Sequence, residues 1–451
     1  MERNIVAVVV ATGLVFLLIG TGIGYFIAPE RVITHRETVN IHREFAGEKI
    51  TVLGYHVSTY DYMEEVVAEF EELTGIDVEL EIVEEEVMRD KQVLDYTSHT
   101  GKYDIAVIGH WHLYEYAGAG FLEPLDDYIQ NKSDPEWMDP DAIPQSVWEG
   151  TKYEGKIYFV PDYINYALTL YRKDVFQTLG IDPSMLSTTE GLMSACDIIK
   201  ESEIDIYPYI ARSSAESSSV MSPLGWAWAY GAKMFDEDYN PQFNTSEFIS
   251  AMEDWVTLLS DYSVSGITTM NWMDTMTLLG QGDVAITVET HDFGPYIDFK
   301  DPTSPTNGKW GWAQPPEGST GYYVQMFYLS GLAINADSTH KDAAWLFNQW
   351  FHDYSVQVGI VGMDFDFVNS RVLESSPFLS SGRHEYKAEL SAASEKLNVT
   401  YWPFIPEFHE VGVAFMEELN KAIIGEKTVQ GAMQDANTRV HDIMETYGYY
   451  D

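Results

Sequence analysis

The stretch Tyr153–Phe176, YEGKIYFVPDYINYALTLYRKDVF, decides the fold that we expect for this chain. A turn at residues 154–156 leads into β-branched and aromatic residues that predict a strand. Pro161 has no backbone N–H to donate, so we expect it where a strand leaves one sheet. The short apolar run that follows is typical of a buried strand in another sheet. The stretch therefore predicts a chain that crosses from one lobe to a second.

Length and composition favour two lobes and argue against several functions. At 451 residues, the chain is too long for one ordinary core. Its 26 Lys and Arg against 71 Asp and Glu give a formal net charge of −45, which repels nucleic acid and anionic lipid. Such an acidic, halophilic-type surface suits a salt-rich medium, where screening reduces self-repulsion. Cys196 is the only cysteine, so neither an intramolecular disulfide nor a cysteine metal cluster is expected.

The amino terminus predicts a membrane anchor. Ile5–Ala28 holds 24 residues without a charge, and as a helix of about 36 Å it would span a bilayer. It lacks a clear A-x-A-like cleavage site and a lipobox cysteine, so we expect residues 1–30 to be a retained transmembrane signal-anchor. Polar residues 31–47 read as a stalk, which places the body outside the cell. N-x-[ST] sequons at Asn131, Asn244 and Asn398 fit such an exported surface.

The body begins with a strand–helix–strand unit. Ile50–Leu53 predicts a short strand, and Ser58 with Asp61 predicts a capping box at the start of a helix. Apolar residues then alternate over residues 76–82, as in a second strand of a parallel α/β sheet. Ligands of such sheets bind beyond the carboxyl ends of the strands, which points to the loop Tyr55–Tyr60.

Several stretches, taken in order, resemble one known family. They are EGKIYFVP to LYRKDVF (residues 154–176), YDIAVIGHWHLYEYAGAGFLEPLDDYI (residues 103–129) and LSGLAINADSTHKDAAWLFNQWF (residues 329–351). This succession is similar to that of ABC-transporter extracellular solute-binding proteins of the maltose-binding-protein-like, sugar-binding class. The resemblance spans about residues 48–447. It implies an α/β, two-lobe periplasmic-binding-protein fold (type II) with several hinge crossings, here preceded by one transmembrane helix.

The resemblance also sets the expected lobe boundaries. The N-terminal lobe would comprise residues 48–161 and 323–371, and the C-terminal lobe would comprise residues 162–322 and 372–451. The chain departs from the family in its extreme acidity and in lacking the lipid-anchor cysteine common in bacterial members. Both departures concern the surface and the anchor.

A ligand cleft between the lobes follows from the same resemblance. It makes Trp111 a stacking platform for a sugar, with packing inside the N-terminal lobe as the alternative, and Glu289 a carboxylate that accepts hydrogen bonds from sugar hydroxyls. Trp226 and Trp228 either stack on sugar faces, which are apolar C–H patches, or belong to the core. The expected ligand-binding residues are His56, Ser58, Trp111, His112, Asp162, Tyr163, Asn165, Trp226, Trp228, Trp272, Glu289, His291, Tyr328 and Trp402.

The histidines also raise the question of zinc. His110 and His112 lie two residues apart, a spacing that places both on one face only within a strand, and here they lie at a strand-to-helix turn. His56 and His291 would have to complete the site, with neither an H-E-x-x-H motif nor a cysteine partner in the sequence. We therefore expect no metal site and no cofactor.

The expected function is that of a monomeric, membrane-anchored receptor that binds a sugar or oligosaccharide for an ABC permease. ATP hydrolysis would belong to the ATPase subunits of that partner, because the chain has no G-x-x-x-x-G-K-[ST] motif. One alternative is a receptor of the same fold for a polyamine, an anion or a metal complex. A glycan-cleaving enzyme with two carboxylates is disfavoured, because nothing places an acid beside a base. A surface adhesion or sensor protein without a permease is a further alternative.

Overall fold

The computed structural model describes residues 42–450, except residues 295–296, 299–302, 362–367, 381–388, 390–391, 394–395 and 399–400. Asn40–Asp451 forms one compact unit, the body. The expected transmembrane segment Ile5–Ala28 lies outside the described residues. Within the described ranges, no helix has both the length and the apolar character that crossing a bilayer requires.

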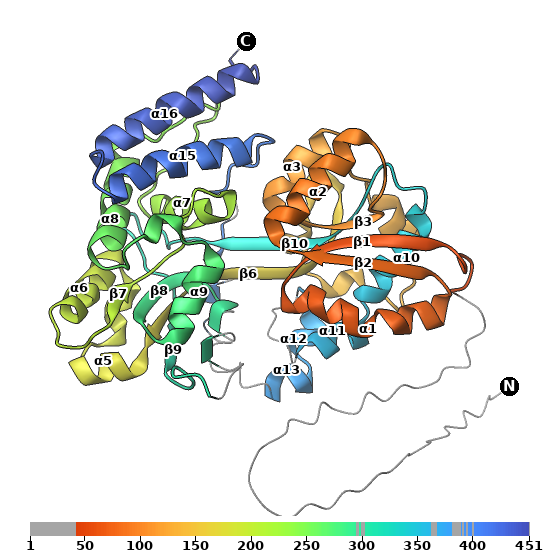
Figure 1. Ribbon diagram of the computed structural model, residues 1–451, viewed down its shortest axis with the longest axis horizontal. Helices are drawn as coiled ribbons and strands as arrows, with labels where there is room; N and C mark the ends of the chain where they lie inside the picture. The colour runs from red at the N-terminus through yellow and green to blue at the C-terminus, as the bar shows by residue number, and fades with distance from the viewer. Residues whose placement is uncertain are drawn as a thin grey trace, which may run out of the picture. The chain divides into compact units, whose positions relative to one another are not determined.

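The N-terminal lobe is a mostly parallel sheet covered by helices (Figure 1). Its strands are β1 (Lys49–Tyr55), β2 (Asp77–Val83), β3 (Ile105–Gly109), β10 (Phe327–Ile334) and the first part of β6 (Phe159–Arg172). They lie in the order β2-β1-β3-β10-β6, in which β10 is antiparallel to both of its neighbours. The helices on this side are α1 (Ser58–Thr74), α2 (Glu85–Ser98), α3 (His110–Gly118), α4 (Gln145–Glu149), α10 (Lys341–Phe351), α11 (Tyr354–Ile360), α12 (Ser370–Leu373) and α13 (Ser376–Ser380). A small hairpin joins β4 (Lys152–Tyr153) to β5 (Lys156–Ile157).

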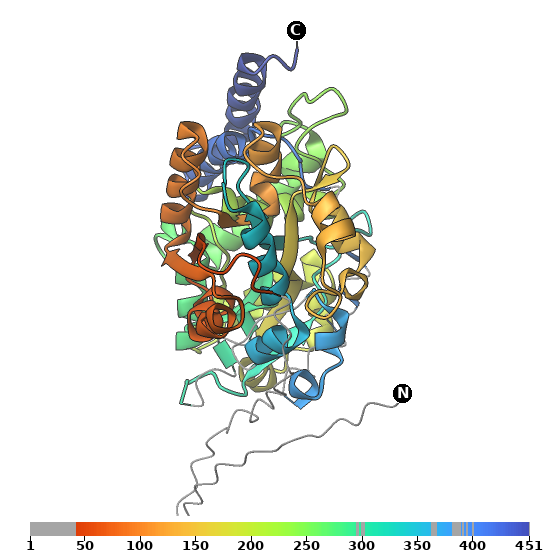
Figure 2. The same ribbon diagram turned by 90° about the vertical axis from the view of Figure 1, so that its right-hand side faces the viewer.

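The C-terminal lobe is built around the second part of β6. Its other strands are β7 (Tyr207–Tyr209), β8 (Val284–Thr290) and β9 (Trp310–Ala313). β6 pairs with β8 and β9, and β8 pairs in parallel with β7. The helices here are α5 (Lys173–Leu179), α6 (Thr189–Lys200), α7 (Met221–Ala229), α8 (Ser246–Asp261), α9 (Trp272–Gln281), α15 (Phe408–Ile423) and α16 (Val429–Thr446). Figure 2 shows α16 extending from the body toward the C-terminus.

β6 carries the chain from one lobe to the other. Residues 159–166 pair with β10, and residues 167–172 pair with β8 and β9. The exchange of partners therefore lies after Tyr166, whereas we expected the strand to leave the sheet at Pro161. One continuous strand serves both sheets.

Pro161 is accommodated by a bulge inside β6. Tyr163 lies opposite Ser330 and Pro161 lies opposite Gly331, so Asp162 is the extra residue of the pair. A Cβ atom on Gly331 would come within 2.0 Å of the Val160 carbonyl oxygen, so this close approach requires glycine. The irregular pairing is where a proline can be tolerated within a sheet.

The first helix does not begin as expected. Val57, and not Ser58, is the N-cap residue of α1, and it makes no side-chain cap hydrogen bond. Asp61 instead lies 3.0 Å from the His56 ring. At the other end, Gly75 adopts a left-handed conformation (φ 75°) that turns the chain into β2.

A buried carboxylate holds the two C-terminal helices together. Glu418 of α15 is 3% exposed. It accepts hydrogen bonds from Lys421 of the same helix, from Lys427 between the two helices, and from Arg439 of α16. Burial alone would raise the pKa of Glu418, but these three cations outweigh it and lower that pKa to about 2. The ionised carboxylate is thus favoured in the folded protein.

We expect Glu418→Gln to lower the free energy of unfolding by about 1–3 kcal/mol at pH 7, because three charge-assisted hydrogen bonds lose their ionised acceptor. A carboxylate with a lowered folded-state pKa stabilises above its unfolded pKa, and this contribution disappears as the pH falls toward 2. The difference between the two proteins in urea unfolding should therefore shrink below about pH 4.5.

Glu417→Gln is the matched control, since Glu417 is exposed, bonds only the same Arg439 in the hydrogen bonds described, and carries the same change in net charge. We expect it to cost less than about 1 kcal/mol. Equal losses for the two variants would contradict the role assigned to Glu418.

Candidate functional site

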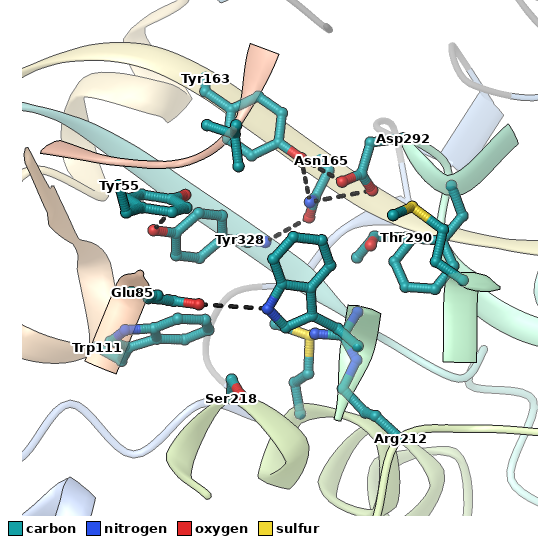
Figure 3. A pocket seen from close by; sticks show the side chains of 15 residues that line it. Tyr55, Glu85, Trp111, Tyr163, Asn165, Arg212, Ser218, Thr290, Asp292 and Tyr328 are labelled. Atoms are coloured by element: carbon teal, nitrogen blue, oxygen red, sulfur yellow. Dashed lines mark hydrogen bonds between the residues drawn. The ribbon is translucent and has the colours of Figure 1, made fainter. Parts of the chain in front are cut away.

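A pocket lies between the two lobes, with about 540 Å³ of empty space that includes open solvent. Figure 3 shows Tyr55, Glu85 and Trp111 on one side and Thr290, Asp292 and Arg212 on the other. The lining residues are Tyr55, Val57, Glu85, Trp111, Tyr163, Asn165, Arg212, Ser218, Met221, Trp272, Met276, Thr290, Asp292, Phe293 and Tyr328. Both lobes therefore contribute to one concave site.

Aromatic rings form the N-terminal wall. The centroids of Trp111 on α3 and Tyr328 on β10 are 4.4 Å apart, and the Tyr55 hydroxyl donates to that of Tyr328 at 3.2 Å. Burial raises the pKa of both tyrosines well above the ordinary value, so their hydroxyls stay protonated. The wall offers apolar faces together with neutral hydroxyls.

A polar network joins the crossing strand to the C-terminal lobe. The Tyr163 hydroxyl donates to Asp292 at 2.5 Å, and the Asn165 amide donates to the same carboxylate at 3.3 Å. The Asn165 oxygen accepts from the backbone N–H of Tyr328 at 2.8 Å. Asp292 follows β8. These bonds therefore connect β6 and, through Asn165, β10 to the side of the pocket that the C-terminal lobe forms.

The floor of the C-terminal lobe holds a buried ion pair. Arg212 follows β7, and its Nε donates to Glu289 at 2.9 Å while Nη2 donates to the second carboxylate oxygen. Glu289 is 0% exposed and lies behind Arg212, outside the lining. Only the guanidinium of this pair reaches the pocket.

One hydrogen bond spans the pocket from lobe to lobe. The indole N–H of Trp272, at the start of α9, donates to Glu85 at 3.3 Å (Figure 3). Glu85 is the first residue of α2 and is partly buried. Burial, with a smaller effect of Glu86, raises the pKa of Glu85 to about 7.

Five of the residues expected to bind ligand line this pocket together. They come from the loops and strands that the sequence placed at the cleft, and they are Trp111, Tyr163, Asn165, Trp272 and Tyr328. Trp111 is 6% exposed, so it is both a core residue and a wall of the pocket. Their roles toward a ligand stay predictions.

Four other expected residues lie outside the lining in the N-terminal lobe. His56 is exposed beside Asp61, and the side chain of Ser58 lies outside the described part of the chain. His112 is buried, with its Nε2 3.2 Å from the Nε of Arg89. Asp162 is buried at the bulge, where it accepts from the Tyr60 hydroxyl.

The remaining expected residues lie in the C-terminal core or behind the lining. Trp226 is fully buried with its ring 6.0 Å from that of Trp255, and Trp228 stacks on Tyr322. Trp402 packs 4.3 Å from Phe408. His291 stacks on Tyr166, and Glu289 is occupied by Arg212 as described above. For the three tryptophans, the core reading fits their placement better than a ligand platform does, because neighbouring side chains cover their rings.

The sequence analysis missed Glu85 and Arg212. Each follows a parallel strand, β2 and β7 respectively, just as Tyr55 ends β1 and Asp292 follows β8. The rule that ligands bind beyond the carboxyl ends of strands would have found both. The rule was applied only to the first strand, and Glu85 did not stand out as a candidate because it lies within a run of glutamates.

The described residues include few clusters of side chains that could coordinate a metal ion. The one group of three potential ligands within them is His441, Asp442 and Glu445, all exposed on α16. Exposed acidic groups gather this way often without an ion. His56, His110 and His112 are not among them.

Comparison with known proteins places this geometry in a family. The model for bacterial extracellular solute-binding proteins matches residues 54–354. A mannitol-binding protein of Pseudomonas aeruginosa is 28% identical over 274 residues, and this match spans 60% of the length of each protein. An erythritol/L-threitol-binding protein of Mycolicibacterium smegmatis is 26% identical over 68% of this chain and 67% of that one.

A solved structure confirms the fold. An ABC transporter solute-binding protein of Agrobacterium vitis with bound D-mannitol superposes with a TM-score of 0.79, at 22% identity, over 90% of this chain and 100% of that one. The predicted two-lobe, α/β periplasmic-binding-protein fold is therefore correct. Since the family model covers well over half of the sequence, the chain belongs to the bacterial extracellular solute-binding proteins.

Proposed function

We propose that this protein captures a polyol or a single sugar in the pocket between its lobes and delivers it to an ABC permease with its ATPase subunits. The observation that carries the proposal is the lining itself. Aromatic faces from one lobe, Trp111 and Tyr328, oppose hydrogen-bonding groups from the other, Asp292 and Thr290. Sugars and polyols present apolar C–H patches bounded by hydroxyls, which this combination satisfies.

The ligand size and class rest on the pocket and on the relatives. The empty space of about 540 Å³ includes open solvent, so the pocket leaves more room for one sugar unit or a linear polyol than for a long oligosaccharide. Two relatives are named for mannitol and for erythritol or L-threitol. Membership in a family of solute receptors agrees with the prediction that the chain is not an enzyme.

Binding would act through closure of the lobes. A ligand that contacts Trp111 on one lobe and Asp292 on the other makes its full set of bonds only when the lobes are together. Such a ligand shifts the open–closed equilibrium by its difference in affinity for the two states. The permease would then recognise the closed form.

The proposal also covers the membrane anchor and the location of the body. We propose that residues 1–30 remain as a single membrane-spanning anchor, with residues 31–47 as a stalk and the body outside the cell as a monomer. The 24 uncharged residues of Ile5–Ala28 support the anchor. The charge of −45 supports a salt-rich surrounding medium.

A thermal-shift screen of the full chain in detergent against alditols, monosaccharides and oligosaccharides tests the ligand class. Ligand at 100 times its dissociation constant adds about 2.7 kcal/mol to the stability of the folded protein. We expect alditols or monosaccharides to raise the melting temperature and long oligosaccharides to have less effect. No shift with any carbohydrate, beside a shift with an anion or a metal complex, would contradict the proposal.

Asp292→Asn should weaken binding of the polyol about 10- to 100-fold in calorimetric titration. The amide keeps the shape of the side chain but removes a charged acceptor, a loss of about 1.5–3 kcal/mol. Asp61→Asn makes the same chemical change on the exposed face of α1 and should leave the affinity unchanged. Equal affinities of the Asp292 variant and the unchanged protein would rule out this carboxylate as a ligand contact.

Deleting residues 5–28 tests the anchor. We expect the full chain to stay in the membrane fraction after washing with alkaline carbonate, and the shortened chain to appear in the soluble fraction. Full-length protein recovered from the medium without its first residues would show instead that the segment is a cleaved signal.

A further inference from the structure

Among the residues that the structure describes, the pocket carboxylate of Glu85 has no cation of its own. Arg212 is the only Lys or Arg among the described residues that line the pocket. Its Nε and Nη2 are both committed to Glu289, which leaves that pair neutral as a unit. The carboxylates of Glu85 and Asp292 therefore exceed the positive charge present at the site.

The two carboxylates are satisfied in different ways. Asp292 accepts from the Tyr163 hydroxyl and the Asn165 amide. Glu85 accepts from a single neutral donor at the long distance of 3.3 Å, the indole of Trp272. A neutral donor provides a hydrogen bond but does not compensate a charge removed from water, so Glu85 is the poorly matched group.

The charges around Glu85 increase this imbalance. Glu86, on the same helix, and Glu216, from the C-terminal lobe, both add negative potential at its carboxyl, and the Trp272 indole and Arg212 oppose them. Burial is the main cause that raises the pKa of Glu85 to about 7, and the carboxylates of Glu86 and Glu216 add to the rise. Forming the charged state here is costly without a cationic partner.

Aromatic faces surround the same carboxylate. Figure 3 shows Glu85 beside Trp111, near the paired rings of Tyr55 and Tyr328. Ring faces attract cations, and they do so more strongly where water is excluded. A carboxylate next to aromatic faces is the chemistry that recognises an ammonium group.

We propose that the pocket is selective for an aminated polyol or amino sugar, whose primary ammonium binds Glu85 against the Trp111 face. This inference rests on the proposed function and specifies the ligand class of the same site. The ammonium would donate to Glu85 in place of, or together with, the Trp272 indole. The hydroxyls of the ligand would bind Asp292 and Asn165 across the pocket.

Glucamine and sorbitol form a matched pair for the test, because they differ by one amine in place of one hydroxyl. In calorimetric titration of the full chain at pH 8, we expect glucamine to bind at least tenfold more tightly than sorbitol. The advantage should decline between pH 8 and pH 6 as Glu85 becomes protonated, while the affinity for sorbitol changes little. The ligand amine itself stays protonated throughout this range.

Glu85→Gln should reduce the affinity for glucamine at least ten times more than the affinity for sorbitol, and it should flatten the pH profile. Glu86→Gln is the matched control, since it removes the same charge from the next, exposed residue and should retain most of the preference. An Asp292→Asn variant should lower the affinity for glucamine and for sorbitol by the same factor.

Sorbitol binding as tightly as glucamine, or a preference that survives Glu85→Gln, would overturn the inference and leave the proposed function standing. Binding of neither ligand, nor of any other polyol or sugar, would overturn both.

Discussion

The continuity of β6 is the constraint on which the rest of the structure depends. A single strand hydrogen-bonds to β10 over residues 159–166 and to β8 and β9 over residues 167–172, so the two sheets share a covalent and hydrogen-bonded axis. A flexible linker would leave the lobes free to separate in any direction. A shared strand that is hydrogen-bonded to β10 restricts the relative motion of the lobes to bending and twisting about that axis. The bulge at Asp162 is the one irregularity that pairing introduces.

The site follows from this axis and from strand direction. Because the parallel strands of each lobe point their carboxyl ends toward the other lobe, the residues after them meet across the gap: Tyr55 and Glu85 from one side, Arg212 and Asp292 from the other. Tyr163 and Asn165 lie on β6 itself, at the base of the pocket. The fold thus brings together side chains that are up to 273 positions apart without any local motif.

The sequence was sufficient for the fold but not for the direction of each side chain. The order of elements and the crossing in β6 could be predicted because hydrophobic periodicity and turn residues are local signals. Whether a tryptophan faces a cleft or a core is not local. Trp226 is covered by Trp255 of α8, and Trp402 packs against His110, which is far earlier in the sequence, as well as against Phe408. The same limit explains the choice of Glu289: it lies within β8, and its partner Arg212 lies 77 residues earlier.

The unmatched Glu85 gives a physical reason for coupling between ligand binding and closure. In an open form, its carboxylate is hydrated, and closure removes that water. With only the Trp272 indole as donor, the empty closed state carries part of the desolvation cost, which destabilises it. A ligand that supplies stronger donors, or a charge, restores the lost solvation and stabilises the closed state selectively. Because a ligand shifts a conformational equilibrium only by its differential affinity, a group that is badly solvated only after closure makes that difference large.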